Sequence, residues 1–263
     1  MRGWTAIATA AWLAACAAPA LAAEPAPATA TASETSSGET NVDPWQPFNR
    51  HTFKLYLFLD DNVLVPVAKG YRAITTPNAR KGLRNFLSNA SSPNTLMNDL
   101  LQGEAKRGGE TLARFVINST IGFLGFADVA GHLGIPGHDE DFGQTLAVWG
   151  VPQGPFLYLP VIGPTTVRDT VGFATDIVAE PLFWIDTSSA QIARTSRFGT
   201  TLVAFREPAI DNLQQIRSDS LDYYASLRSF YLQARKREIA NGRQTFEDLP
   251  DIGSFDDSAE PSQ

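Results

Sequence analysis

The sequence predicts a mainly α-helical protein, a single domain of short amphipathic and hydrophobic helices. At several points a capping residue and a proline precede an apolar run, as at Thr76-Pro77, and apolar residues then recur every three or four positions. Sustained period-two alternation, which is typical of half-buried strands, is absent from the sequence. The composition allows a substantial core, because 43% of the residues are hydrophobic and only 19% are charged.

The first residues resemble the leader of an exported bacterial precursor. A charged start and an apolar run lead to Leu13-Ala14-Ala15-Cys16, which contains the single cysteine of the chain. This tetrapeptide resembles a lipobox, so we expect residues 1–15 to be a signal peptide and Cys16 to be the lipid attachment site. The alternative is cleavage after residue 22, at Ala20-Leu21-Ala22, which would release a periplasmic chain without an acyl anchor.

Composition divides the remainder into three segments. Residues 16–42 are rich in Ala, Pro, Thr and Ser and predict a disordered tether behind the acylated N-terminus. Residues 43–243 contain the helical signals and predict the folded domain. Residues 244–263 are acidic and predict a disordered tail.

The first helices of the domain are marked by prolines. A helix is expected to begin near Pro47, because proline is tolerated in a first turn. The run Phe53–Leu59 then places apolar residues all round this helix, which must be buried on every side by protein or by lipid. Thr76-Pro77 and Ser92-Pro93 predict the starts of two further helices, and the second is expected to end at Gly103.

Charge is unevenly distributed along these helices. Residues 62–98 contain no Asp or Glu, whereas the whole chain has a net charge of −7. Cations without nearby counter-ions suit anionic lipid headgroups or an acidic partner surface, and a solvated basic face is the alternative. The predicted headgroup or partner patch consists of Arg72, Arg80, Lys81 and Arg84.

The stretch Phe115–Ile135 is long enough to be weighed as a membrane-spanning helix, but four glycines interrupt it. We expect two short apolar helices joined around Gly122–Phe126. This hairpin either packs in the core or lies in a membrane interface.

The C-terminal half alternates helices with a proline-rich segment. A short helix is predicted from Phe142 to Gly150. The apolar run Phe156–Ile162 is bounded and interrupted by prolines, so it is expected to be extended or turned. Further helices are predicted from about Thr166 to Ala179 and from Asp211 to about Ala240.

Few residues indicate catalysis. The chain has three histidines (His51, His132 and His138) and no nucleophile elbow, phosphate-binding loop or dinucleotide motif. The run His138–Asp141 is the most metal-like cluster, but consecutive side chains point in different directions, and a helix N-terminus explains its acidic residues. We expect no enzyme activity, no metal and no cofactor. No motif supports a serine hydrolase built from Ser91 or Ser119 with a histidine.

Ordered motifs extend from about residue 41 to residue 184. They are Asp43-Pro44, Phe48-Asn49-Arg50, Pro66–Tyr71, Asn85-Phe86, Asn98, Leu101–Gly103, Arg114–Gly122, Glu140–Leu146, Trp149–Val151, Leu159-Pro160, Gly163-Pro164 and Arg168-Asp169. In this order the motifs resemble the MlaA/VacJ lipoprotein family, and the C-terminal helix resembles it more loosely.

The resemblance implies a ring-like helical body with an amphipathic channel, seated in the inner leaflet of the Gram-negative outer membrane and facing the periplasm. It implies that mislocalised phospholipid is removed from the outer leaflet and passed to a periplasmic carrier (MlaC-like), so that lipid asymmetry is maintained. The implied partners are phospholipid, as cargo, a trimeric outer-membrane porin and the carrier, with no nucleic acid.

Two sets of residues are our candidates for handling lipid. The hairpin set would flex beside the channel with its large side chains in lipid: Gly122, Phe123, Leu124, Gly125, Phe126 and Gly131. The first-helix set would line the channel: Phe48, Asn49, Phe53 and Leu57. Arg168 and Asp169 are expected to form a structural ion pair. Two rival functions stay open, a membrane-tethered lipid hydrolase and a structural envelope lipoprotein associated with porins.

Overall fold

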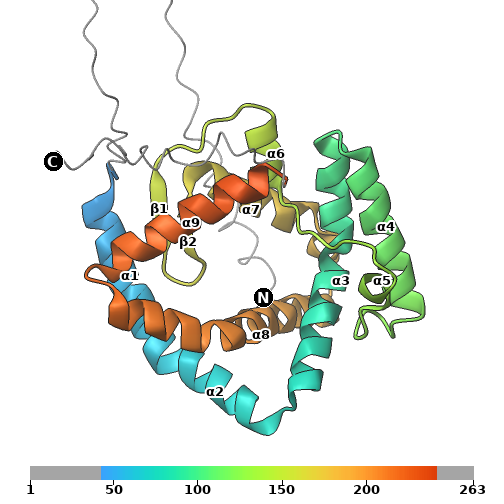
Figure 1. Cartoon of the computed structure of the whole chain (residues 1–263), viewed down its shortest axis with the longest axis horizontal. Helices are drawn as coiled ribbons and strands as arrows, with labels where there is room; N and C mark the ends of the chain where they lie inside the picture. Colours follow the sequence, from blue (N-terminus) through green and yellow to red (C-terminus); the bar gives the residue numbers. More distant parts are fainter. Residues whose placement is uncertain (1–42, 242–263) are drawn as a thin grey trace, which may run out of the picture. The chain divides into compact units, whose positions relative to one another are not determined.

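The computed structural model describes residues 43–241 (Figure 1). Within this range the chain is mainly helical, as predicted, with one two-stranded antiparallel sheet. The elements are, in chain order, α1 (Gln46–Leu59), the π-helix η1 (Asp60–Leu64), α2 (Val65–Ile74), α3 (Pro77–Leu101), α4 (Ala105–Thr120), α5 (Val129–His132), α6 (Phe142–Val148), β1 (Phe156–Leu159), β2 (Gly163–Thr166), α7 (Val167–Ala179), the 3₁₀-helix η2 (Pro181–Trp184), α8 (Ser188–Asp219) and α9 (Tyr223–Ile239).

The helices α1, η1 and α2 follow one another without a break. Pro47 lies in the first turn of α1, as predicted, where no intrahelical partner is lost. The π-helical turn between α1 and α2 directs two aspartates towards α8. Asp60 accepts hydrogen bonds from Arg206 at 2.8 Å, and Asp61 accepts one from Arg217 at 2.9 Å. These pairs fix the first helical segment against α8.

An aromatic core joins α1, β1 and α9. It consists of Phe53, Phe156, Tyr158, Tyr224 and Leu232. The rings of Phe53 and Tyr158 meet edge to face with centroids 4.9 Å apart, a geometry that aromatic pairs prefer. Three segments that are distant in the sequence are therefore held together by one apolar cluster.

The protein covers only one side of α1. Phe53 is 7% exposed, whereas Leu55 is 47% and Phe58 is 62% exposed. The expectation that this helix is buried on every side is therefore not met by contacts within residues 43–241.

The prediction that a separate helix begins at Ser92-Pro93 is wrong, because α3 continues through Pro93. A proline inside a helix costs about 3 kcal/mol, and contacts of α3 with α4, α6 and α8 offset this cost. The turn after the proline is also tied to α7, since Asn94 and Asn98 donate to Asp176 at 3.1 and 3.3 Å. The predicted stop at Gly103 is confirmed, with a φ of +79°.

The glycine-rich stretch Phe115–Ile135 was predicted to form two short helices, and the structure confirms that it is not a single helix. Helix α4 ends at Thr120, a turn follows, and α5 covers Val129–His132. Among residues 43–241, no helix combines the length and apolar character needed to cross a bilayer.

The elements from α6 to α7 agree closely with those predicted from the sequence. Asp141 caps α6 by accepting from the amide of Gln144 at 2.9 Å, and Gly150 ends it with a φ of +85°. The proline-rich segment is extended, with Phe156 of β1 opposite Thr166 of β2. Thr166 is also the N-cap of α7.

The single C-terminal helix predicted from Asp211 is wrong, because α8 and α9 are separate helices. The backbone of Ser220 is extended, with a ψ of 132°, and Asp222 then caps α9 by accepting from the amide of Ala225 at 3.2 Å. A capping side chain offers the amides a partner outside the helix, which favours a break at this point. The turn allows Tyr224 to reach the aromatic core.

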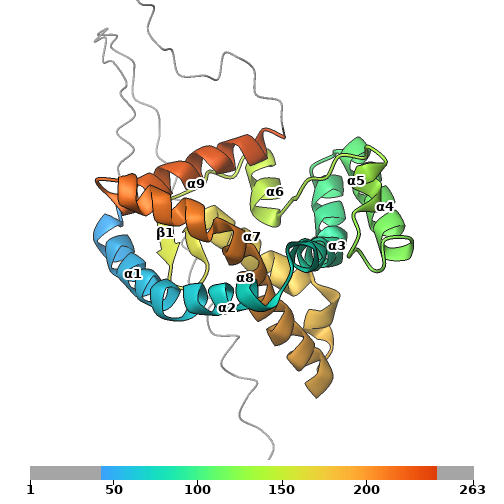
Figure 2. The ribbon, with the colours of Figure 1, turned by 60° about the horizontal axis from the view of Figure 1, so that its bottom comes forward.

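Within residues 43–241 the elements follow one another around a circuit (Figure 1). Contacts lead from η1 and α2 to α8, from α8 to α3, from α3 to α6 and from α6 to α9; the two strands connect α9 back to α1. Helix α8 contacts both α2 and α3 (Figure 2). This order agrees with the ring-like arrangement that the resemblance implied.

Candidate functional site: an amphipathic series of cavities around α3

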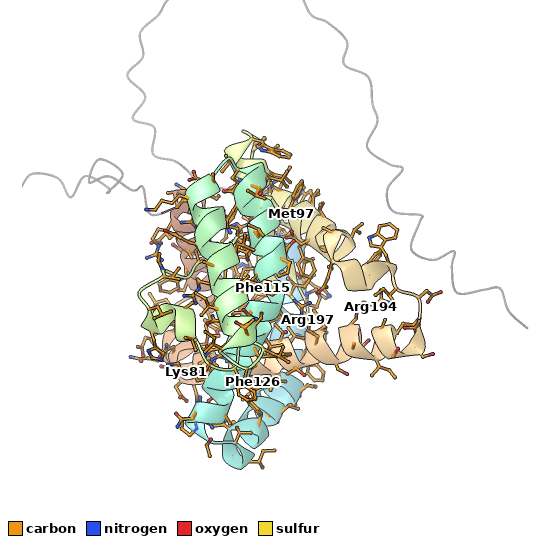
Figure 3. All side chains as sticks on the ribbon, turned by 90° about the vertical axis from the view of Figure 1, so that its right-hand side faces the viewer. Lys81, Met97, Phe115, Phe126, Arg194 and Arg197 are labelled. Carbon is orange, nitrogen blue, oxygen red and sulfur yellow. The ribbon has the colours of Figure 1, made fainter. Side chains whose placement is uncertain are left out.

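A large apolar cavity lies between α3, α7 and α8. Its volume is about 960 Å³, which is within the range of ligand pockets. Met97 on α3 and Arg197 on α8, both labelled in Figure 3, belong to its lining. The apolar side chains that line the cavity are Leu83, Phe86, Leu87, Ala90, Pro93, Met97, Phe173, Ile177, Ala179 and Ala193.

One edge of this cavity is charged. Arg197 forms an ion pair with Glu180, and its Nη2 donates to the Ser91 hydroxyl at 3.0 Å. Burial lowers the pKa of the Arg197 guanidinium. Burial likewise raises the pKa of the Asp176 carboxyl, which lies on the same wall and accepts from Asn94. The cavity therefore combines a large apolar wall with charges of both signs.

Two smaller cavities adjoin α3 as well and share lining residues with their neighbours. A mixed cavity of about 360 Å³ shares Leu87, Ser91 and Asn94 with the apolar one. A polar cavity of about 210 Å³, between α3 and α4, shares Ser88 and Thr95 with the mixed one. The successive faces of α3 thus change from apolar to polar, which is the combination that an amphiphile requires.

The sequence suggested that the basic patch lacks counter-ions, but the structure places a carboxylate against it. Arg72, Arg80 and Arg84 all contact the buried carboxylate of Glu207, with nitrogen–oxygen distances of 2.7, 3.4 and 3.5 Å. Lys81 is exposed. The sequence reasoning missed Glu207 because this residue lies on α8, 135 residues after Arg72.

The turn between α4 and α5 presents apolar side chains to solvent. Phe123 and Leu124 are 85% and 65% exposed and have φ values of 54° and 57°. Two consecutive bulky residues in the left-handed region are uncommon, and such backbone strain clusters at functional sites. Phe126 is also exposed on one side, while its ring stacks on Phe86 at 5.0 Å.

The glycines of this hairpin are required by close packing. Gly125 has a φ of +96°, and a Cβ there would lie 2.4 Å from the Cβ of Asn89. A Cβ on Gly122 would lie 2.3 Å from the carbonyl oxygen of Ala127, and one on Gly131 would meet the carboxylate of Asp128. These contacts hold the turn tightly, which differs from the flexing role expected of the glycines.

The first-helix candidates divide into two groups. Asn49 and Phe53 are buried in the core, where the Asn49 amide donates to the Phe156 carbonyl and accepts from the Tyr158 amide. Leu57 packs against the same core. Only Phe48 is largely exposed among the four. The buried positions are occupied by protein packing, which speaks against a channel-lining role for them.

The residues of the metal-like run His138–Asp141 do not form one cluster by themselves. His138 and Glu140 do approach one another, but their companion is Asp99 of α3, and the three ligand atoms lie within 4.8 Å. Arg107 offsets one of the two carboxylate charges in this cluster, with Nη2 2.6 Å from Glu140 and Nε 3.8 Å from Asp99. Asp141 instead caps α6 and pairs with Arg235.

In the described part of the chain, neither Ser91 nor Ser119, the serines considered for a hydrolase, belongs to a serine–histidine pair. Ser91 accepts from Arg197, and Ser119 accepts from Asn89 at 2.8 Å. Within residues 43–241, neither serine forms a hydrogen bond with a histidine. The expected ion pair between Arg168 and Asp169 is present at 2.9 Å.

The sequence reasoning missed the charged edge of the apolar cavity. Arg197 and Glu180 belong to different helical segments, and neither stands in a recognisable motif. Cys16, the tether and the predicted tail lie outside the described residues.

Comparisons with known proteins place the chain in a family. The family model described as MlaA lipoprotein matches residues 41–238. The intermembrane phospholipid transport system lipoprotein MlaA of Escherichia coli K12 is 33% identical over 215 residues, covering 80% of this chain and 83% of that protein. An uncharacterized protein of Rickettsia felis is 33% identical over 198 residues, covering 75% and 78%.

A solved structure gives the same result. It was described as the structural basis for maintenance of bacterial outer membrane lipid asymmetry, and it matches with a TM-score of 0.66 and 31% identity. The match covers 75% of this chain and 99% of that one. Both the sequence motifs and the helical circuit therefore have counterparts in known proteins, and the chain belongs to the MlaA lipoprotein family.

Proposed function

We propose that this protein is a phospholipid-transport lipoprotein of the bacterial envelope. It removes mislocalised phospholipid from the outer leaflet of the outer membrane and passes it to a periplasmic carrier, which maintains lipid asymmetry. Membership of the MlaA family supports this function, as do the transport role named for the E. coli relative and the lipid asymmetry named for the solved structure.

The observation that carries the proposal is the amphipathic series of cavities around α3. Acyl chains require an apolar wall, and the cavity of about 960 Å³ supplies one. Headgroups require polar partners, which the mixed and polar cavities supply on the adjoining faces. Helices satisfy the backbone groups of their interior turns, so the helical walls of these cavities offer acyl chains a largely apolar surface.

The proposal extends to location and partners. Acyl chains on Cys16 would anchor the protein, since several chains make membrane attachment durable. The body would lie in the inner leaflet of the outer membrane, beside a trimeric porin, and face a carrier of the MlaC type. Passage between successive binding sites needs neither catalysis nor a cofactor.

A pair of variants tests the cavity. Ala193→Trp would fill part of it, whereas Thr195→Trp changes an exposed neighbour on the same helix outside the cavity. In a strain lacking the native gene, we expect Ala193→Trp to raise outer-leaflet phospholipid, measured with a membrane-impermeant amine reagent, and Thr195→Trp to restore the barrier. The proposal fails if both variants complement equally and the purified wild-type protein retains no phospholipid.

The same purification separates the rival functions. Intact phospholipid in the detergent-extracted protein, identified by mass spectrometry, supports transport. Lysophospholipid or free fatty acid would favour a hydrolase. Association with a porin without bound lipid would favour a structural role.

A further inference from the structure

The apolar cavity carries a charge pair on its wall. Arg197 and Glu180 face each other there, and their side chains are 30% and 34% exposed. Ser91 adds a hydroxyl that already accepts from Arg197 at 3.0 Å. Apolar side chains such as Phe173 and Met97 surround this polar edge. A headgroup that separates this ion pair must therefore supply a partner for each charge or leave one of them unpaired.

The signs of these charges restrict the ligand. A purely anionic group would bind Arg197 but would take it from Glu180, and Asp176 on the same wall adds a second carboxyl. Half-buried charges left without a partner disfavour such a complex. A ligand with a phosphodiester and an ammonium group would replace both halves of the ion pair, since the phosphate suits the guanidinium and the ammonium suits the carboxylate.

We propose that this cavity selects phospholipids with a zwitterionic, amine-bearing headgroup over anionic phospholipids with an uncharged polyol headgroup. The phosphodiester lies on Arg197, the ammonium on Glu180, and an acyl chain along the apolar wall. This assignment rests on the proposed function, because it names the cargo of the same cavity. The cavity discriminates because an anionic phospholipid leaves a protein charge unpaired, not because the acyl chains of the zwitterionic lipid fit better.

The test uses the full-length protein in detergent, stripped of lipid and mixed with equimolar phosphatidylethanolamine and phosphatidylglycerol of identical acyl chains. Bound lipids are counted by native mass spectrometry. We expect the wild-type protein to favour phosphatidylethanolamine by roughly 1.5- to fivefold, the range for losing one partly exposed charge pair. Glu180→Gln should abolish the preference, whereas Asp186→Asn, an exposed acid nearby, should leave it unchanged.

A second pair of variants tests the cation. Arg197→Met should weaken the binding of both lipids, because both contain the phosphodiester. Arg194→Met is the matched control, since Arg194 lies on the same helix and bonds instead to the Phe183 carbonyl. Equal binding of the two lipids by the wild-type protein, or a preference that survives Glu180→Gln, overturns the headgroup assignment while leaving transport intact. Absence of any lipid binding by the wild-type protein would overturn the proposed function itself.

Discussion

Replacing Asn49 should destabilise the fold substantially. The side chain is 0% exposed, its amide nitrogen donates to the Phe156 carbonyl at 2.9 Å, and its oxygen accepts from the Tyr158 amide at 3.0 Å. Asn49→Ala leaves both backbone groups buried without these partners. Each such group costs about 1–3 kcal/mol, so we expect a loss of about 2–6 kcal/mol from a total of about 5–15 kcal/mol.

Urea unfolding of the full-length protein in mild detergent, followed by circular dichroism, measures this loss. Asn62→Ala is the matched control, because Asn62 also donates to a carbonyl, that of Phe58 at 2.7 Å, but is exposed. The control should change the free energy of unfolding by less than about 0.5 kcal/mol. If Asn49→Ala stays within that range, the core role of Asn49 is refuted. A stable variant that no longer retains phospholipid would revive its role as a channel residue.

A second substitution at the same position gives a pH readout. Asn49→Asp keeps an acceptor for the Tyr158 amide but loses the donor to the Phe156 carbonyl, and it places a carboxylate beside Asp43. Burial and the neighbouring acid favour protonation of the new carboxyl, which restores the donor. This variant should therefore be least stable near pH 7 and recover as the pH falls towards 5, opposite to a salt-bridged acid.

Three further predictions concern the hairpin, the charged network and catalysis. Gly125→Ala should destabilise the hairpin and raise detergent sensitivity. Gly134 also has a positive φ, but a Cβ there would meet no atom within 4 Å, so Gly134→Ala should cost only the backbone strain of about 1–2 kcal/mol. Arg235→Met should cost about 3–5 kcal/mol in urea unfolding, because the buried Arg235 guanidinium pairs with both Asp141 and Asp169, at 2.6 and 3.0 Å. His138→Ala should still complement a deletion strain, and loss of complementation with an unchanged fold would favour the hydrolase.

The Arg235 prediction carries an acid dependence. Burial opposes ionisation of Asp141 and Asp169, but hydrogen bonding and the charge of Arg235 lower the pKa of both carboxyls. Such groups stabilise the fold above their unfolded pKa of about 3.9, and the stabilisation is lost as the pH falls through the folded pKa. We expect Arg235→Met to remove part of the acid sensitivity below about pH 4. The exposed Arg237→Met should leave the pH profile unchanged.

Helix boundaries set by neighbouring residues were predictable from the sequence. Thr76 and Thr166 cap α3 and α7, and Gly103 and Gly150 adopt the positive φ that ends a helix. These signals act through the adjacent backbone amides and carbonyls, so a single sequence contains all the information they need. The family resemblance was equally accessible, because its motifs are continuous.

Boundaries that depend on tertiary contacts were not predictable in this way. Pro93 predicted a helix start, yet α3 continues through it because α4 and α8 hold both sides of the helix. The break at Ser220 was hidden by an apolar stripe that continues from α8 into α9. Local propensity gives a preference of a few kcal/mol, and packing over a helix face exceeds it.

The basic patch shows why charge counted along the sequence misidentifies a binding surface. Glu207 lies more than one hundred residues from Arg72 and Arg84, so its three arginine partners looked unpaired in the sequence. Asp211 pairs with Arg72 as well. Three arginines with two carboxylates leave one positive charge in excess, and exposed Lys81 adds a second. Attraction to anionic headgroups at this patch would therefore arise from about two charges, a modest and salt-sensitive contribution. Selectivity is better sought at the Arg197–Glu180 pair, where charges of both signs lie on the wall of the apolar cavity.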